Sequence, residues 1–255
     1  MSQRAIELFN QLAPVYDETL PFFSGFAARH IEWLDPAPGT RVLDLGAGAG
    51  ALTGAALARG CRVTAVDGAP AMVAKLTARH PGVPAQVMDV RELDFPDGSF
   101  DLVCAGFVIH LLDDPAAAAA EVRRVLVPGG VFSFSCPCGA EDSRWDFYGD
   151  LQREFQSYLP PGAGRLGKPL DGEELLAGAG FGEVDFVDID QSLPVADADT
   201  FWEFALSHGS RALIDALPEP RRAQFEARLR AELATMDPIV YSAGASFYRG
   251  ATPSN

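Results

Sequence analysis

The sequence has few cysteines and no evident metal-binding pattern. Its 255 residues include four cysteines, at positions 61, 104, 136 and 138, all in or beside strand-like runs. In a chain without an export signal, this pattern indicates reduced, mostly buried thiols in a cytoplasmic protein. Cys136 and Cys138 are separated by one residue, but the second pair of ligands that a zinc site requires is missing. We therefore expect no bound metal.

Long apolar segments and an excess of positive charge are also missing. The longest strongly apolar stretch, residues 102–109, is too short to span a bilayer. The first ten residues carry charge early and contain no continuous apolar run, so no signal peptide is expected. The chain has 20 Lys and Arg but 35 Asp and Glu, a net charge of −15. Because phosphate backbones and anionic lipids attract clustered cations, we expect neither a nucleic-acid nor a membrane partner.

The order of elements in the first half of the chain predicts a parallel α/β sheet. Short apolar runs alternate with helical segments of about a dozen residues, which is typical of strand–helix–strand crossovers. We expect strands at residues 41–45, 62–66, 85–88, 100–105 and 131–136, and helices at 5–12, 22–34, 51–60, 70–80 and 115–126. The nearly continuous apolar strands indicate helices on both faces of the sheet.

The second half of the chain follows a less regular pattern. Residues 140–170 predict a helix and a loop rich in Pro and Gly, and 172–180 predict a short helix. A strand is expected at 183–190, two or three helices at 198–236, and a final strand at 239–248. This length suits one large α/β domain with insertions.

A glycine-rich turn follows the first expected strand. Gly46, Gly48 and Ala51 fit the spacing of a dinucleotide-binding turn, and Asp67 stands where such proteins bind a ribose hydroxyl. Glycines at this position let the backbone approach a ligand at a helix N-terminus. A phosphate-binding P-loop is excluded, because no Gly-Lys-Ser/Thr follows. An NAD(P)-dependent oxidoreductase therefore remains one interpretation of this turn.

Asp44 favours a different ligand. Its carboxylate lies two residues before Gly46, where it would repel a pyrophosphate at the helix N-terminus. A ligand with an ammonium and a sulfonium but no phosphate would tolerate or favour that charge. S-adenosylmethionine has this chemistry, so the turn is predicted to bind it.

Five ordered blocks carry a family resemblance: VLDLGAGAG, VTAVDGAPAMV, VMDVRELDFPDGSFDLV, FVIHLLDDP and RVLVPGGVF. Together they resemble the class I S-adenosylmethionine-dependent methyltransferases, above all the group with the ubiquinone and menaquinone enzymes and many natural-product enzymes. The resemblance covers residues 38–137 and, more loosely, AIELFNQLAPVYD near the start. It implies S-adenosyl-L-methionine as the cofactor and S-adenosyl-L-homocysteine as the product.

The resemblance also implies a fold. It is a Rossmann-like, seven-stranded, mostly parallel sheet with helices on both faces, an antiparallel last strand and helical lid insertions. Within a single domain, residues 1–37 form an N-terminal helical cap and 38–137 the cofactor-binding core. Residues 138–255 supply the remaining strands and the lid insertions at about 140–170 and 197–236.

The same resemblance assigns residues around the cofactor. The methionine end is expected to contact the glycine turn and the end of the fourth strand: Asp44, Gly46, Ala47, Gly48, Ala105 and Gly106. The adenosine end is expected to contact a second group: Asp67 at both ribose hydroxyls, Gly68 and Met72 beside the adenine, and Asp89 with the Val90 amide at its edge. Tyr16 is expected to close over the cofactor. Core packing for Met72 and Tyr16, and a solvated carboxylate for Asp89, remain the alternatives.

Chemistry and acceptor selection involve other residues. His110 follows the fourth strand and is the candidate general base, but a supporting role near the cofactor competes strongly with that interpretation. Trp145, Tyr148, Phe201 and Trp202 lie in the two insertions and are the candidates for an apolar lid over the acceptor, unless they form the insertions' own core.

The sequence therefore favours methyl transfer to a small, hydrophobic or aromatic metabolite by in-line displacement at the sulfonium. Two alternatives remain. One is the oxidoreductase, and the other is a protein that binds the cofactor without methylating, as a sensor or a cyclisation catalyst. The acceptor atom and the oligomeric state are left open.

Overall fold

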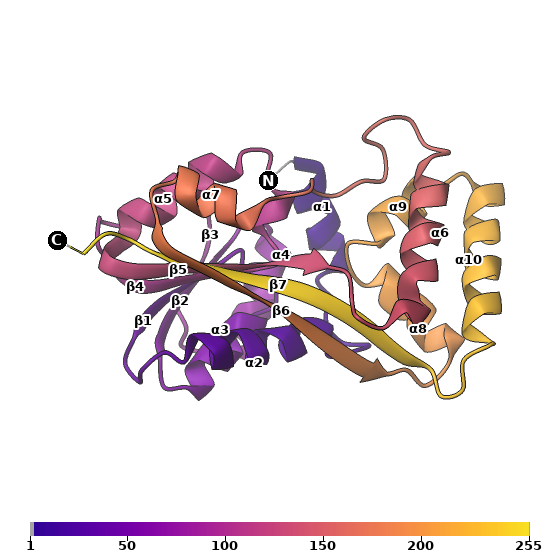
Figure 1. Cartoon of the computed structure of the whole chain (residues 1–255), viewed down its shortest axis with the longest axis horizontal. Helices are drawn as coiled ribbons and strands as arrows, with labels where there is room; N and C mark the ends of the chain where they lie inside the picture. The colour runs from indigo at the N-terminus through magenta and orange to yellow at the C-terminus, as the bar shows by residue number, and fades with distance from the viewer. Residues whose placement is uncertain (1–2, 255) are drawn as a thin grey trace.

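The chain folds around one mixed β-sheet. In the computed structural model, which describes residues 3–254, seven strands lie in the order β3-β2-β1-β4-β5-β7-β6 (Figure 1). They are β1 (Arg41–Leu45), β2 (Arg62–Asp67), β3 (Ala85–Val87), β4 (Phe100–Gly106), β5 (Leu126–Cys138), β6 (Gly182–Pro194) and β7 (Val240–Ala251). The pairs from β3 to β5 are parallel, whereas β7 is antiparallel to both β5 and β6. This confirms the predicted Rossmann-like sheet with its antiparallel last strand.

Helices cover both faces of the sheet. The α-helices in residues 3–254 are α1 (Gln3–Leu12), α2 (Phe22–Leu34), α3 (Ala51–Ala58), α4 (Pro70–Arg79), α5 (Pro115–Val125), α6 (Asp146–Gln156), α7 (Gly172–Gly178), α8 (Ala198–Leu206), α9 (Arg211–Ala216) and α10 (Glu219–Leu233), of which α6, α8, α9 and α10 lie beside the sheet and not on its faces (Figure 1). On one face, Val122 of α5 and Leu176 of α7 share a buried cluster with Phe134 of β5. On the other face, α2 and α3 lie side by side (Figure 1), and Ile31 of α2 shares a buried cluster with Leu52 of α3.

The local sequence explains why α5 forms where it does. Asp114 caps the helix, because its Oδ1 accepts a hydrogen bond of 3.0 Å from the backbone N–H of Ala117. Pro115 suits the first helical position. Ala118, Val122 and Val125 lie three or four residues apart, and all three are fully buried against the sheet. The spacing seen in the sequence therefore becomes the packed stripe of the helix.

Three strands, β5, β6 and β7, exceed their predicted lengths by more than one residue. β5 begins at Leu126 instead of residue 131, since Leu126 pairs with Phe100 before the register of the two strands shifts. β6 and β7 pair from Gly182 opposite Ala251 to Pro194 opposite Val240, and their far halves extend past the other strands (Figure 1). Their C-terminal ends, past residues 190 and 248, are set by pairing with a distant partner, so local hydrophobicity does not mark them.

The two insertions form one helical lobe, consisting of α6, α8, α9 and α10 (Figure 1). Residues 198–236 contain three helices, within the predicted two or three. Phe155 of α6, Phe201 of α8, Ile214 of α9 and Phe225 of α10 are buried in one shared cluster. Burying such side chains stabilises the lobe by roughly 1.5–3 kcal/mol each. The division into cap, core and tail stays a prediction.

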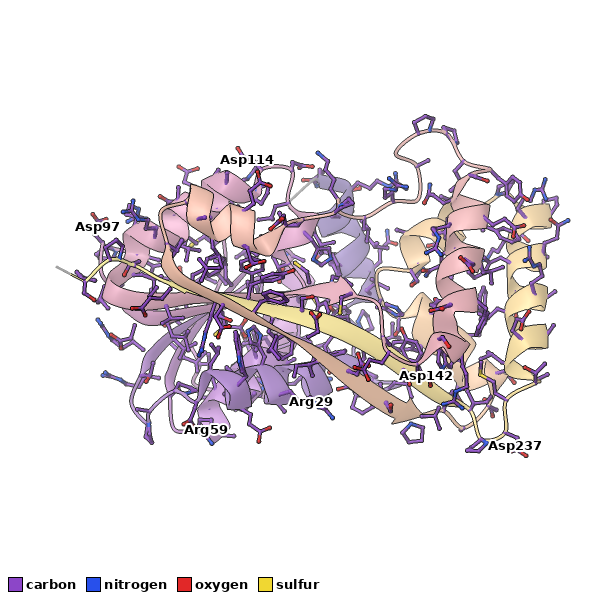
Figure 2. The ribbon with its side chains drawn as sticks, in the orientation of Figure 1. Arg29, Arg59, Asp97, Asp114, Asp142 and Asp237 are labelled. Carbon is purple, nitrogen blue, oxygen red and sulfur yellow. The ribbon has the colours of Figure 1, made fainter. Side chains whose placement is uncertain are left out.

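Charged side chains occupy the periphery, as Arg59, Asp97 and Asp237 show (Figure 2). Several of them form ion pairs, among them Arg59 with Asp35. Across residues 3–254, no helix combines the length and the apolar character needed to cross a bilayer. Over the same range, no three His, Cys, Asp or Glu residues are grouped to hold a metal ion.

Candidate active site

The glycine turn connects β1 to α3 and is fixed to the end of β2. The backbone N–H groups of Gly46 and Ala47 both donate to the carbonyl of Val66, at 2.8 and 2.9 Å. Gly46 has a φ of +69°, a conformation that favours glycine. A Cβ at that position would lie 2.5 Å from Cγ2 of Val108. The turn therefore requires a glycine both for its backbone conformation and for its space.

Two adjoining hollows open at this turn. The larger, of about 220 Å³, is lined by most of the predicted cofactor residues: Tyr16, Gly46, Gly48, Asp67, Gly68, Met72, Asp89, Val90 and Gly106. The smaller, of about 40 Å³, is lined by Asp44 and Ala47 and again by Tyr16, Gly46, Gly48 and Gly106. Ala105 is fully buried in the sheet and lines neither hollow. The structure thus brings the predicted set together, with Ala105 behind it.

Asp44 is a buried carboxylate with one oxygen left open. Its side chain is 1% exposed, and Oδ2 accepts a hydrogen bond of 2.6 Å from the Thr53 hydroxyl. Oδ1 is buried without a partner. Burial raises the pKa of Asp44 to about 7, against the opposing effect of the Thr53 hydrogen bonds. A buried acceptor of this kind suits a cationic donor in the smaller hollow.

Asp67 ends β2 and holds the turn from the opposite side. Its Oδ2 accepts from the Gly48 N–H at 2.8 Å, and its Oδ1 accepts from the Ala69 N–H at 2.7 Å. Burial raises the pKa of Asp67, and these two backbone hydrogen bonds oppose the rise. Each carboxylate oxygen has a second lone pair for a hydroxyl donor in the larger hollow.

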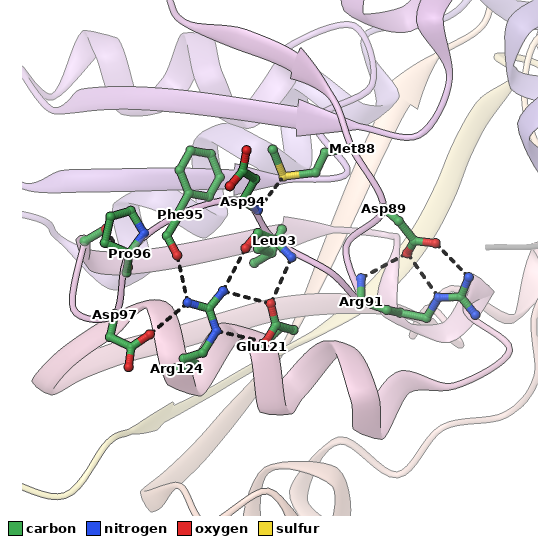
Figure 3. Close-up of polar contacts among 11 residues, drawn as sticks. Met88, Asp89, Arg91, Leu93, Asp94, Phe95, Pro96, Asp97, Glu121 and Arg124 are labelled. Atoms are coloured by element: carbon green, nitrogen blue, oxygen red, sulfur yellow. Dashed lines mark hydrogen bonds and ion pairs between the residues drawn. The ribbon is translucent and has the colours of Figure 1, made fainter.

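Asp89 is engaged by a neighbouring arginine (Figure 3). Arg91 donates to both of its oxygens, from Nε at 3.0 Å and from Nη2 at 2.7 Å. These contacts lower the pKa of Asp89 to about 2. The next segment is held by Arg124, which donates to the carbonyls of Leu93 and Phe95 (Figure 3). The wall that contains Asp89 is therefore fixed in place without a ligand.

Two aromatic residues that were not predicted from the sequence, Phe23 and Phe107, line the smaller hollow together with Tyr16. Phe23 stacks on Tyr16 at 4.6 Å between ring centroids, and Phe107 lies 5.7 Å from Phe23. Phe107 has a φ of +56°, which is uncommon for a residue that is not glycine and is found at functional sites. Burial, together with the charges of Asp17 and Asp67, raises the pKa of Tyr16 well above its ordinary value. The sequence feature that could have identified Phe107 is its place directly after Gly106, at the carboxyl end of β4.

A third cavity, of about 1000 Å³, lies between the sheet and the helical lobe. Tyr16, Phe23 and Phe107 line it as well as one or both hollows, so the three spaces adjoin. His110 also lines it. Burial lowers the pKa of His110 to about 4, and its Nδ1 is buried without a partner. The imidazole is therefore neutral at physiological pH and has a free nitrogen.

His208 of the lobe, a weaker candidate base than His110 on the sequence alone, lines the same cavity. Its Nδ1 lies 2.6 Å from the Phe204 carbonyl, so that nitrogen carries the proton and Nε2 is an acceptor. The Ser210 hydroxyl lies 3.3 Å from Nε2 and accepts from the Gln152 amide at 3.0 Å. Burial lowers the pKa of His208 to about 4. These groups form a polar strip on the wall of the cavity.

The four lid candidates lie elsewhere. Trp145, Tyr148 and Phe201 are buried in the core of the lobe, and Trp202 packs against that core. Trp145 Nε1 donates to the Val240 carbonyl at 2.6 Å, which joins the lobe to β7. None of the four lines the three cavities described here. The structure brings them together as a packing cluster, because an inserted lobe must bury a face of its own.

Comparison with known proteins places the chain in a family. Residues 43–134 match the family model described as "Methyltransferase domain". Nocamycin O-methyltransferase of Saccharothrix syringae is 30% identical, over 96% of this chain and 100% of that protein. An uncharacterized methyltransferase of Mycobacterium tuberculosis is 41% identical, over 51% of this chain and 52% of that protein. Several matched relatives are thus covered over only about half of their length.

The solved structures agree on the fold. The YcgJ protein of Bacillus subtilis superimposes with a TM-score of 0.58 at 21% identity, over 90% of this chain and 98% of that one. The match to Nocamycin O-methyltransferase covers nearly all of both chains and therefore shows the family of this chain. The chain belongs to the S-adenosylmethionine-dependent methyltransferases, and S-adenosylmethionine is their cofactor, as the sequence predicted. The residues present fit that cofactor, because the open Oδ1 of Asp44, which lines the smaller hollow, suits an ammonium group.

Binding of S-adenosylhomocysteine is expected to strengthen as Asp44 ionises. The raised pKa of about 7 means that ligand-free Asp44 is mostly protonated near pH 6 and mostly ionised near pH 8. Affinity should therefore rise several-fold over that interval, measured by isothermal titration. The Asp44→Asn variant should bind more weakly and show a flat profile. An unchanged slope in that variant would assign the pH dependence to another group.

The same raised pKa has a consequence for stability. Protonated Asp44 stabilises the ligand-free fold fully below its unfolded value of 3.8, and this contribution is lost as the pH rises through about 7. Thermal unfolding at a series of pH values should show wild type losing more stability than Asp44→Asn over that range. If the stability of the two proteins fell in parallel with pH, the result would contradict a buried Asp44 carboxyl with a raised pKa.

Proposed function

We propose that the chain transfers a methyl group from S-adenosylmethionine to a small, hydrophobic or aromatic acceptor held in the cavity of about 1000 Å³. The observation that carries this proposal is the shared aromatic wall. Tyr16 and Phe107 line both the hollow at the glycine turn and the large cavity. An acceptor in the cavity would therefore meet the methyl group directly. The 30% identical relative that spans this chain is named for an O-methyl transfer, which favours oxygen as the acceptor atom.

Each residue in this proposal has a limited task. When bound, the cofactor supplies a methyl group on a positively charged sulfur. Asp44 would hold the ammonium, Asp67 the ribose hydroxyls, and the wall beside Asp89 and Val90 the adenine. Tyr16, Phe23 and Phe107 exclude water and align the acceptor, and such orientation supplies roughly 7–11 kcal/mol. His110, neutral because burial lowers its pKa to about 4, is the proposed recipient of a proton that the acceptor loses.

Composition supports the remaining parts of the proposal. A net charge of −15 disfavours a nucleic-acid or anionic-membrane partner, so the acceptor is a small molecule. Within residues 3–254 the four cysteines are free, which supports work in a reducing compartment such as the cytoplasm.

The test is mass spectrometry of a metabolite panel incubated with cofactor carrying an isotopically labelled methyl group. Incorporation of the label into a hydrophobic or aromatic acceptor is expected, and its loss in Asp67→Ala is the control. Binding of S-adenosylhomocysteine with no labelled product across the panel would favour a non-methylating role instead. Tight binding of NADH without S-adenosylhomocysteine binding would revive the oxidoreductase.

A further inference from the structure

The large cavity has an unusual distribution of charge. Its lining includes two arginines, Arg153 of α6 and Arg165 of the loop that follows, and within residues 3–254 no Asp or Glu lines it. The chain as a whole has 35 acidic residues and only 20 basic ones. A cavity in such a chain that is bordered only by positive formal charge is therefore complementary to an anion.

Both guanidinium groups are available to a ligand. Arg165 is exposed and forms no ion pair in the part of the chain that the structure describes. Arg153 pairs with Asp150, but both side chains are exposed, at 74% and 69%, so this pair contributes little and is easily exchanged. A Cβ at Gly149, which also lines the cavity, would lie 3.2 Å from Nη1 of Arg153. The missing side chain lets that guanidinium lie along α6 at the cavity wall.

We infer that the methyl acceptor is an aromatic or polycyclic acid, whose anionic group is bound by Arg153 and Arg165 while its rings lie against the aromatic wall. This inference rests on the proposed function. A guanidinium group binds a carboxylate through two parallel hydrogen bonds. Two arginines at the cavity therefore favour a carboxylate over an anion that lacks two oxygens in one plane. The apolar contacts come from Phe22, Phe23, Phe107 and Tyr241 on the same cavity.

The test uses two probes of equal shape, 2-naphthoate and 2-naphthamide. Isothermal titration of each into the full chain saturated with S-adenosylhomocysteine is expected to show at least tenfold tighter binding of the naphthoate at low salt. The preference should shrink as salt is raised, because screening weakens exposed ion pairs. Equal affinities, or binding of neither probe, would overturn the inference.

Variants assign the preference to the two arginines. In Arg153→Gln/Arg165→Gln, naphthoate affinity should fall to that of naphthamide, while naphthamide affinity stays unchanged. The matched control is Arg62→Gln/Arg123→Gln, which removes the same charge at positions outside the cavity lining and should keep the preference. A preference that survives in the first double variant would overturn the assignment.

Failure of this inference and failure of the proposed function give different results. S-adenosylhomocysteine binding and label transfer from the cofactor are measured separately in each variant. If label were transferred to neutral acceptors and naphthoate were not preferred, the inference of an anionic acceptor would be refuted and the proposed methyl transfer would stand. A naphthoate preference that depends on the arginines, without any label transfer, would keep the anion site and sink methyl transfer.

Discussion

Replacing Asp67 by alanine is expected to weaken S-adenosylhomocysteine binding by at least tenfold, about 1.4 kcal/mol or more. The variant loses the proposed contacts to both ribose hydroxyls. It also removes the carboxylate that accepts hydrogen bonds from the Gly48 and Ala69 N–H groups, at 2.8 and 2.7 Å. The turn that faces the cofactor would then keep only its backbone hydrogen bonds to the Val66 carbonyl as ties to β2. Isothermal titration on folded protein measures the affinity, and thermal unfolding reports the loss of the Asp67 hydrogen bonds.

Two further variants separate binding from folding. Asp67→Asn keeps one acceptor oxygen and should bind with an affinity between those of wild type and Asp67→Ala. Asp101 is the matched control, because it also accepts a hydrogen bond from a backbone N–H, that of Arg41 at 2.9 Å, but at the amino ends of β4 and β1. Asp101→Ala should reduce stability and leave the cofactor affinity unchanged. An Asp67→Ala protein that folds and binds as wild type does would refute the ribose assignment.

The sheet and its first helices follow from local patterns. Residues 42–45 form a short apolar run between turn residues, and Pro115 with Asp114 marks a helix start, so these elements were placed within a residue or two. The end of β6 carries no such mark, since the strand was predicted to end at residue 190 and continues to Pro194. Gln191 and Ser192 lie on a strand that pairs with β7 on one side only, where polar residues are tolerated. Their strand conformation depends on a partner about fifty residues away.

The residues of the site also divide into those that local sequence predicts and those that it does not. The structure brings Gly46, Gly48 and Asp67 together as the sequence predicted, because the glycine spacing and the place of Asp67 at the end of the next strand are local features. Phe23 and Phe107 become a wall only when α2 and the end of β4 meet, and no local pattern reports that meeting. The four lid candidates illustrate the opposite error. Trp145 and Phe201 have the composition of a pocket, yet their contacts, 4.9 Å between ring centroids, are those of a core.

Replacing Gly46 by alanine is expected to lower S-adenosylhomocysteine affinity at least a hundredfold, about 2.7 kcal/mol. The left-handed conformation alone costs an L-residue roughly 1–2 kcal/mol. The new Cβ would also lie 2.5 Å from Cγ2 of Val108, closer than side chains approach. Either Val108 or the turn must move, and both line the larger hollow. Titration calorimetry and denaturant unfolding measure the two effects on binding and stability.

Gly39 separates the backbone cost from the steric one. It has a φ of +86°, and a Cβ there would meet nothing within 4 Å. Gly39→Ala should therefore lose about 1–2 kcal/mol of stability for its conformation alone and keep full cofactor affinity. The double variant Gly46→Ala/Val108→Ala removes the overlap and should regain part of the binding that Gly46→Ala loses, as a coupled pair does. If the two single glycine variants bound the cofactor equally well, the turn would not be the cofactor-binding site, since of these two glycines Gly46 lines the larger hollow and Gly39 does not.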